Sequence, residues 1–128
     1  MESKFLTELA VQEVGEGTWQ LLGDLKYQSE LFNGIIVAPV GFLTDFASVP
    51  RVPIAYTAFG DRAHRESTLH DFLYFTALVS KVMADKIFLE AMKARNKQFW
   101  VRWSMYIGVR VGGSKAWNEH RKQGHPNS

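Results

Sequence analysis

The sequence contains no cysteine, so disulfide bonds and thiolate metal sites are both excluded. It has no apolar run near the roughly 18 residues that a membrane-spanning helix requires. The N-terminus reaches Glu8 and Glu13 without the apolar stretch of a signal peptide. Neither a zinc-finger pattern nor an aromatic-rich RNA-binding motif is present. We therefore expect a chain made in the cytoplasm, with no transmembrane segment and no strong nucleic-acid signature.

The composition is that of one globular domain. The 128 residues are 46% hydrophobic and 22% charged, which excludes disorder, collagen and a coiled coil. A chain of this length buries roughly two-thirds of its unfolded surface and needs no cross-links to fold. A single domain over residues 1–128 is predicted, with a β-rich part at 1–50, a helical part at 63–120 and a short polar tail at 121–128.

The charge is unevenly distributed along the chain. Residues 1–92 hold 7 Lys/Arg and 12 Asp/Glu, whereas residues 93–128 hold 8 Lys/Arg and a single acidic residue, Glu119. A basic end of this kind can bind nucleic acid, an anionic membrane or an acidic neighbour in an assembly. It is equally consistent with a solvated helix face that complements the acidic half of the chain.

The N-terminal third has the residue pattern of β-strands. Strands are predicted at residues 7–14, 18–27 and 35–42. Asn33-Gly34 is the dipeptide favoured by a type I′ turn, so the last two strands should form a hairpin. Pro39 suggests an edge or a bulge in the third strand. We expect a small antiparallel meander.

The second half of the chain has helical periodicity. Residues 43–62 contain prolines and no regular pattern, which predicts a long irregular connection. Helices are predicted at residues 64–78, 81–97 and 99–111, with Ser80 as the N-cap of the second and Gly112-Gly113 ending the third. Because strands precede helices, the fold class is α+β: a small N-terminal β-meander, a long irregular connection and three C-terminal helices.

A histidine, a tyrosine and an aspartate are candidates for catalysis on the first two helices. Tyr74 lies one turn after His70, and Asp85 lies at the edge of an apolar stripe, where an unpaired carboxylate is costly to bury. The two helices should be antiparallel neighbours, so His70 or Tyr74 is the expected partner of Asp85. A carboxylate that holds one imidazole nitrogen leaves the other as a general base. The alternative is a buried hydrogen-bond network that only fixes the helix pair.

Two further aspartates are candidate metal ligands. Asp71 points about 100° away from His70 on its helix and could ligate a hard cation such as calcium. Asp45 follows the last strand and has two interpretations. It either caps the connection together with Ser48, or it reaches the His70 region as a ligand or orienting group. His120 is expected to be solvated in the basic end of the chain.

The third helix carries a cationic stripe. Arg102, Tyr106 and Arg110 recur every four residues, so they share one face. This stripe could bind a phosphate or carboxylate, and it could equally pair with Asp71 or Asp85.

Several motifs together resemble a phage and prophage family of unknown function, numbered 1353. They are the runs GFLTDFASVPR at 41–51, HDFLY at 70–74, Ala84-Asp85-x-x-Phe88 and Val109-Arg110, within about residues 35–117. The resemblance implies a bacteriophage or prophage origin and brings no established activity. We therefore expect a virion-associated component of the tail or baseplate region. Its partners would be other phage structural proteins or an acidic protein surface, and its location the host cytoplasm and then the virion.

The same helix pair is also similar to that of phospholipase-A2-like enzymes. This similarity implies that His70 activates water, Asp71 binds calcium, Asp85 orients His70, and Tyr74 bonds to Asp85. The calcium loop Tyr-x-Gly-x-Gly is absent upstream, so calcium and the oxyanion lack their expected backbone partners. The alternative function is thus a small metal-assisted hydrolase of a cell-envelope ester or amide, with His70 as general base.

Overall fold

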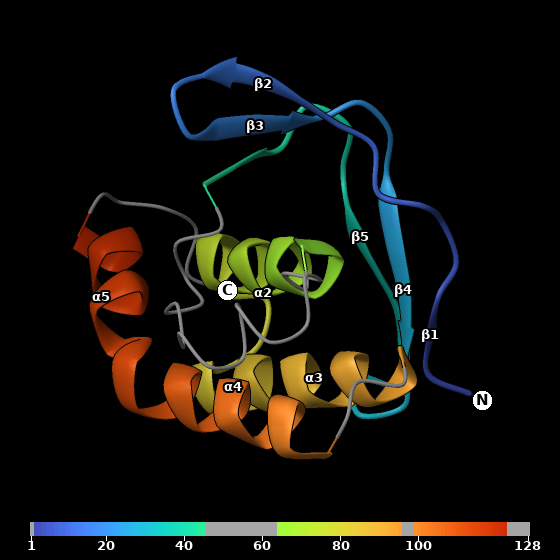
Figure 1. Ribbon diagram of the computed structural model, residues 1–128, viewed down its shortest axis with the longest axis vertical. Coiled ribbons are helices and arrows are strands. Elements are labelled where there is room, and N and C mark those ends of the chain that lie inside the picture. The colour runs from blue at the N-terminus through green and yellow to red at the C-terminus, as the bar shows by residue number, and fades with distance from the viewer. Residues whose placement is uncertain (1, 46–63, 96–98, 123–128) are drawn as a thin grey trace.

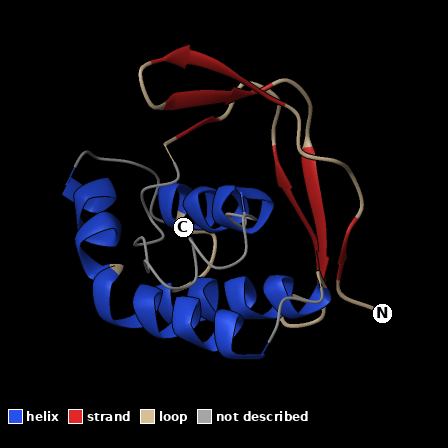
Figure 2. Ribbon diagram, viewed as in Figure 1, coloured by secondary structure: helices blue, strands red, loops and turns tan. Residues whose placement is uncertain are grey.

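The computed structural model describes residues 2–45, 64–95 and 99–122, in which strands from the N-terminal part are followed by helices (Figure 1). The α+β class is therefore confirmed, and Figure 2 shows that strands and helices occupy separate parts of the molecule. Helix α2 (His64–Thr76) lies in the middle and contacts α3, α5, β5 and β6. Its central position matters because α2 carries His70, Asp71 and Tyr74.

One antiparallel sheet has the order β1-β4-β5, formed by β1 (Lys4–Phe5), β4 (Leu25–Ser29) and β5 (Gly34–Ala38). The predicted β4–β5 hairpin is confirmed, but its turn type is wrong. Ser29 pairs with Gly34, which leaves a four-residue loop, and in this loop Asn33 has a φ of 60°. Loops of this length form around type I turns rather than type I′ turns. Strand β5 ends directly before Pro39 at the sheet edge, as predicted.

The other antiparallel sheet has the order β2-β3-β6, formed by β2 (Val11–Gly15), β3 (Thr18–Leu21) and β6 (Leu43–Thr44). The strand predicted at 18–27 is wrong, because β3 and β4 are separate strands in different sheets. Asp24 stabilises the bend between them: its carboxylate accepts the Val40 amide at 2.8 Å, and its carbonyl accepts the Thr7 hydroxyl at 3.0 Å. Contacts of this kind join distant residues and leave no local sequence pattern.

The other helices are α3 (Lys81–Ala94), α4 (Phe99–Gly112) and α5 (Ser114–Lys122). Ser80 caps α3 as predicted, accepting the Met83 amide at 3.1 Å. The prediction of three helices is wrong, because the described residues contain a fourth, α5, directly after Gly113. Helix α5 is polar, and tertiary contacts hold it: Trp117 packs against the core, and Arg121 donates to the carbonyls of Tyr74 and Phe75.

The main core lies between the β1-β4-β5 sheet and the helices. Tyr27 and Ile36 of the sheet pack against buried residues of α2 and α3, among them Leu69, Leu73 and Ile87. The predicted connection is described only at 43–45. Its remainder with Ser48, and the tail beyond Lys122, lie outside the described residues. Among the helices that the structure describes, none has the length and apolar character of a membrane span.

Candidate functional site

The site is centred on Asp85, which α3 places against α2. One carboxylate oxygen, Oδ1, lies 2.7 Å from His70 Nε2 and accepts the Tyr74 hydroxyl at 2.7 Å. His70 and Tyr74 are one turn apart on α2, so both reach the same oxygen. The sequence predicted His70 or Tyr74 as the partner of Asp85, and the structure shows that both bond to it.

The second carboxylate oxygen of Asp85 binds two cations. Lys81 Nζ donates to Oδ2 at 2.9 Å, and Arg110 of α4 donates at 3.0 Å. Lys81 also donates to the Val109 carbonyl at 3.3 Å, near the end of α4. Of the two interpretations of the cationic stripe, the structure shows internal pairing for Arg110. Arg102 is not among the partners of Asp85, and anion binding by Arg102 stays a prediction.

The electrostatics define the protonation states in this network. Burial alone would raise the pKa of Asp85, but the hydrogen bonds from His70, Tyr74 and Lys81 and the electrostatic attraction of His70 together outweigh it and lower the pKa below its usual range. Burial and the bond to Asp85 raise the pKa of the Tyr74 hydroxyl well above its ordinary value. Asp85 is thus a carboxylate and Tyr74 a neutral donor. Because a carboxylate only accepts, His70 Nε2 carries a proton toward Asp85.

The network is closed to solvent. His70, Tyr74 and Asp85 are each 0% exposed. The imidazole lies between two rings, 4.1 Å from Tyr74 and 5.0 Å from Phe88 by centroid distance. Residues of α2, α3 and α4 therefore meet at one buried carboxylate, an arrangement that fixes how the three helices pack.

A cavity of about 330 Å³ lies beside this network, between the β2-β3-β6 sheet and helices α2 and α5. It brings together the two predicted metal ligands, Asp45 and Asp71, and Thr44 donates a hydrogen bond to Asp71. His120 also lines the cavity and is partly buried, so the prediction that it is solvated is wrong. Its position depends on α5, and the sequence pattern did not indicate that helix.

The residues that line the cavity meet only part of the requirements of the predicted divalent-cation site. Asp45 and Asp71 supply oxygen ligands of the kind that calcium prefers. Within the described ranges, no group of three or more His, Asp or Glu side chains is arranged to hold a metal ion. Two carboxylates alone do not complete the six to eight oxygen ligands of calcium, so calcium binding stays a prediction.

Sequence reasoning missed a second carboxylate with several partners, Glu90 on α3. Its Oε1 accepts the Tyr27 hydroxyl at 2.8 Å and the Ser29 hydroxyl at 2.7 Å, and its Oε2 accepts the Leu31 amide at 2.9 Å. These donors come from β4 and from the loop after it, about 60 residues away in sequence. Glu90 therefore joins α3 to the sheet.

Comparison with known proteins places the chain in a family. A family model described as "Protein of unknown function (DUF1353)" matches residues 19–109. The match covers more than half of the chain, so the chain belongs to the DUF1353 family. No curated protein and no solved structure matches it.

Proposed function

We propose that this member of the DUF1353 family is a non-enzymatic component of a larger protein assembly. The observation that carries the proposal is the closure of the His70–Asp85 pair, whose side chains are both 0% exposed. A general base has to come within hydrogen-bond distance of the proton that it removes. A pair enclosed by ring contacts and by two helices serves packing better than it serves proton transfer.

The charges around Asp85 support the same conclusion. His70 contacts Oδ1 of Asp85, whereas Lys81 and Arg110 both bind Oδ2. Side chains from α2, α3 and α4 therefore bind the same carboxylate. Separating Asp85 from both cations would leave a buried carboxylate uncompensated, and this penalty disfavours other helix arrangements. A chain with such a network presents one defined surface to its neighbours.

The outer face of α4 supplies a surface suited to such neighbours. Trp103, Ile107 and Val111 recur every four residues and are 39%, 57% and 78% exposed. Large apolar side chains aligned on one exposed helix face are typical of protein contact sites. This apolar stripe supports a partner on α4.

We propose a phage particle as the assembly, with the chain at its tail or baseplate region. The support is the resemblance of the sequence motifs to a phage and prophage family, together with the basic C-terminal part of the chain. The partners would be other phage structural proteins or an acidic protein surface. The chain would be made in the bacterial host cytoplasm and then enter the virion.

The test is mass spectrometry of particles purified from bacteria that express the gene from its own locus. We expect the chain in the particles at a constant ratio to the tail proteins. A chain that is absent from the particles, and monomeric in solution by light scattering, would contradict the proposal.

One observation favours a second function, a small metal-assisted hydrolase. Asp71, the neighbour of His70, lines the 330 Å³ cavity together with Asp45 and His120. In this function Asp85 would orient His70, and His70 would accept a proton from water at Nδ1. Asp71 and Asp45 would hold a divalent cation such as calcium, which would supply positive charge to the developing oxyanion.

The two functions are separated by an ester-hydrolysis assay on phospholipid vesicles with calcium or EDTA. The assembly function predicts no turnover in either condition. Calcium-dependent turnover that is lost in Asp71→Asn, and kept in the control Asp24→Asn, would establish the hydrolase instead.

A further inference from the structure

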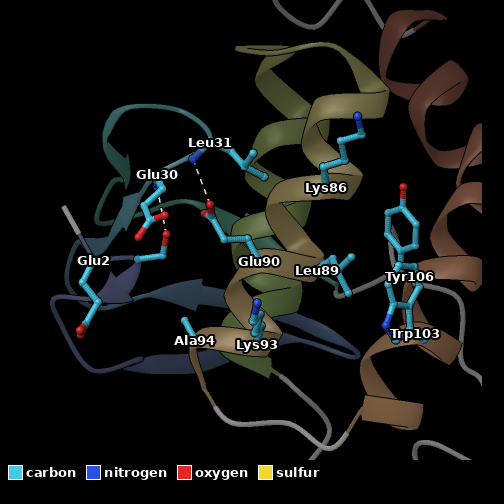
Figure 3. A pocket seen from close by; sticks show the side chains of 11 residues that line it. Glu2, Glu30, Leu31, Lys86, Leu89, Glu90, Lys93, Ala94, Trp103 and Tyr106 are labelled. Carbon is cyan, nitrogen blue, oxygen red and sulfur yellow. Dashed lines mark hydrogen bonds between the residues drawn. The ribbon is translucent and has the colours of Figure 1, made fainter.

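A groove of about 840 Å³ is formed by the N-terminal segment, the β4–β5 loop, α3 and α4, and Figure 3 shows its lining. Glu2 and Glu30 lie at one end, on the N-terminal segment and the β4–β5 loop. Residues of α3 form the middle, and Trp103 and Tyr106 of α4 form the other end. None of these residues belongs to the predicted catalytic or metal sites.

The groove is a built feature because Glu90 holds its walls together. Figure 3 shows the Glu90 carboxylate in the centre, bonded to the Leu31 amide. The other Glu90 oxygen is occupied by the hydroxyls of Tyr27 and Ser29. The carboxylate keeps its charge, but within the described residues it forms no ion pair with a lysine of the groove.

Two lysines supply the positive charge of the groove. Lys86 and Lys93 lie seven residues apart on α3, which places them on the same face and about 10 Å apart along the axis. Both are exposed, and neither forms an ion pair with any residue in the described part of the chain. Ammonium groups carried at that spacing suit two carboxylates of an extended ligand better than one small anion.

The end formed by α4 is aromatic. Trp103 and Tyr106 pack edge to face, with ring centroids 5.6 Å apart, and Figure 3 shows both facing the lysine-bearing side of α3. Leu31 on the opposite wall is 47% exposed. Aromatic side chains flanked by apolar residues are the anchors that contribute most of the energy in protein interfaces. The apolar stripe of α4 continues from Trp103 away from the groove.

We infer that this groove binds a segment of a partner protein with a defined charge pattern. The segment would place an apolar side chain between Leu31 and Trp103, and carboxylates on Lys86 and Lys93. A basic side chain of the segment would face Glu2 and Glu30 at the other end. This inference rests on the proposed function, because it assigns the partner contact of the assembly to one surface.

The first experiment is photocrosslinking in the bacteria that make the particle. Leu31 is replaced by p-benzoylphenylalanine, and the crosslinked peptide is identified by mass spectrometry. We expect a peptide of another particle protein with Asp or Glu and an apolar residue close to the crosslink, and Lys or Arg nearby. A peptide without acidic residues, a crosslink to a second copy of this chain, or no crosslink would each overturn the inference.

The second experiment compares two charge reversals that change the net charge equally. Lys86→Glu with Lys93→Glu alters the groove, whereas Lys4→Glu with Lys26→Glu alters exposed lysines of β1 and β4 that do not line it. We expect the groove variant to load into particles about tenfold less than wild type, and the control to load normally. Equal thermal unfolding of both variants shows that the fold is intact.

The outcomes separate the two proposals. Equal loading of both variants would overturn the inference that the groove binds a partner, and it would leave the proposed assembly function intact. Absence of the wild-type chain from the particles would overturn the assembly function and this inference together.

Discussion

Asp85 and Glu90 lie five residues apart on α3, and each carboxylate collects hydrogen bonds from distant elements. Asp85 binds a histidine, a tyrosine and two cations, and it is completely buried. Glu90 binds a tyrosine, a serine and a backbone amide, all neutral, and it lines an open groove. Helix α3 therefore carries two carboxylates that anchor it to other elements. Asp85 is the charged anchor, because two of its partners are cations, and Glu90 is the neutral anchor, because all of its partners are neutral.

The different partners of Asp85 and Glu90 correspond to their different exposure to solvent. A fully buried carboxylate needs cations to offset its desolvation, so the Asp85 network is closed and fixes α2, α3 and α4. A partly exposed carboxylate needs only neutral donors, so Glu90 can form part of a surface. The residues that look most catalytic in the sequence are therefore the internal ones, and the groove faces solvent.

The largest expected effect is that of Asp85→Asn. The amide leaves Lys81 and Arg110 without a counter-charge, and we expect the free energy of unfolding to fall by about 3–5 kcal/mol. Urea denaturation of wild type and variant measures this difference. Glu16→Gln in the exposed β2–β3 turn is the control and should change stability by less than about 0.5 kcal/mol. A loss for Asp85→Asn no larger than that of this control would contradict the role of Asp85 as a buried, charge-paired carboxylate.

The next largest effect is expected for Gly113→Ala, between α4 and α5. A Cβ at Gly113 would lie 2.5 Å from the Tyr74 hydroxyl, so it displaces the donor that Asp85 needs. We expect a loss of about 1–3 kcal/mol in thermal or urea unfolding. At Gly23, apart from its two chain neighbours, no atom of the described residues lies within 4 Å of an added Cβ, so Gly23→Ala should be nearly neutral. A neutral Gly113→Ala would show that the Tyr74 position is not fixed by close packing.

Glu90→Gln should cost less than Asp85→Asn. The amide oxygen keeps an acceptor for part of the donor set, and no buried cation is left unpaired. We expect a loss of about 1–2 kcal/mol by urea denaturation. A loss as large as that of Asp85→Asn would contradict the contrast between a charged and a neutral anchor.

Tyr27 and Tyr74 give the smallest effect, a decrease in stability at alkaline pH. Burial, then the bonds to Glu90 and Asp85, raise the pKa of each hydroxyl well above 10.0, its ordinary value. Above that pH the unfolded state loses protons that the native state keeps, so the free energy of unfolding falls as pH rises. Urea midpoints measured on both sides of pH 10 should show this decrease, and Tyr27→Phe with Tyr74→Phe should flatten it.

Local patterns allowed part of the fold and site to be predicted. Ser80 as a helix cap, the hairpin at Asn33 and the partnership of Asp85 with His70 and Tyr74 all follow from spacing within about 15 residues. An aspartate beside an apolar stripe requires a partner, and the neighbouring helix supplied it. The resemblance to family 1353 rested on the runs at 41–51 and 70–74 and on residues 84–88 and 109–110, and the match over residues 19–109 confirms the family.

The features that were missed depend on contacts between distant segments. Glu90 resembles any exposed glutamate in the sequence, and its donors lie about 60 residues earlier. Helix α5 is polar, and it is held by Arg121 bonding to the carbonyls at the end of α2. His120 then enters the cavity with Asp45 and Asp71 only because α5 forms. None of these contacts has a local signature.

The most direct test of the account is the free energy of unfolding of His70→Ala. A packing network predicts a loss of about 2–4 kcal/mol, because the variant leaves a cavity and removes a buried bond to Asp85. Residues kept for catalysis often limit stability, so replacing one tends to leave the fold unchanged or more stable. A His70→Ala chain as stable as wild type, or more stable, would contradict the structural role of the network.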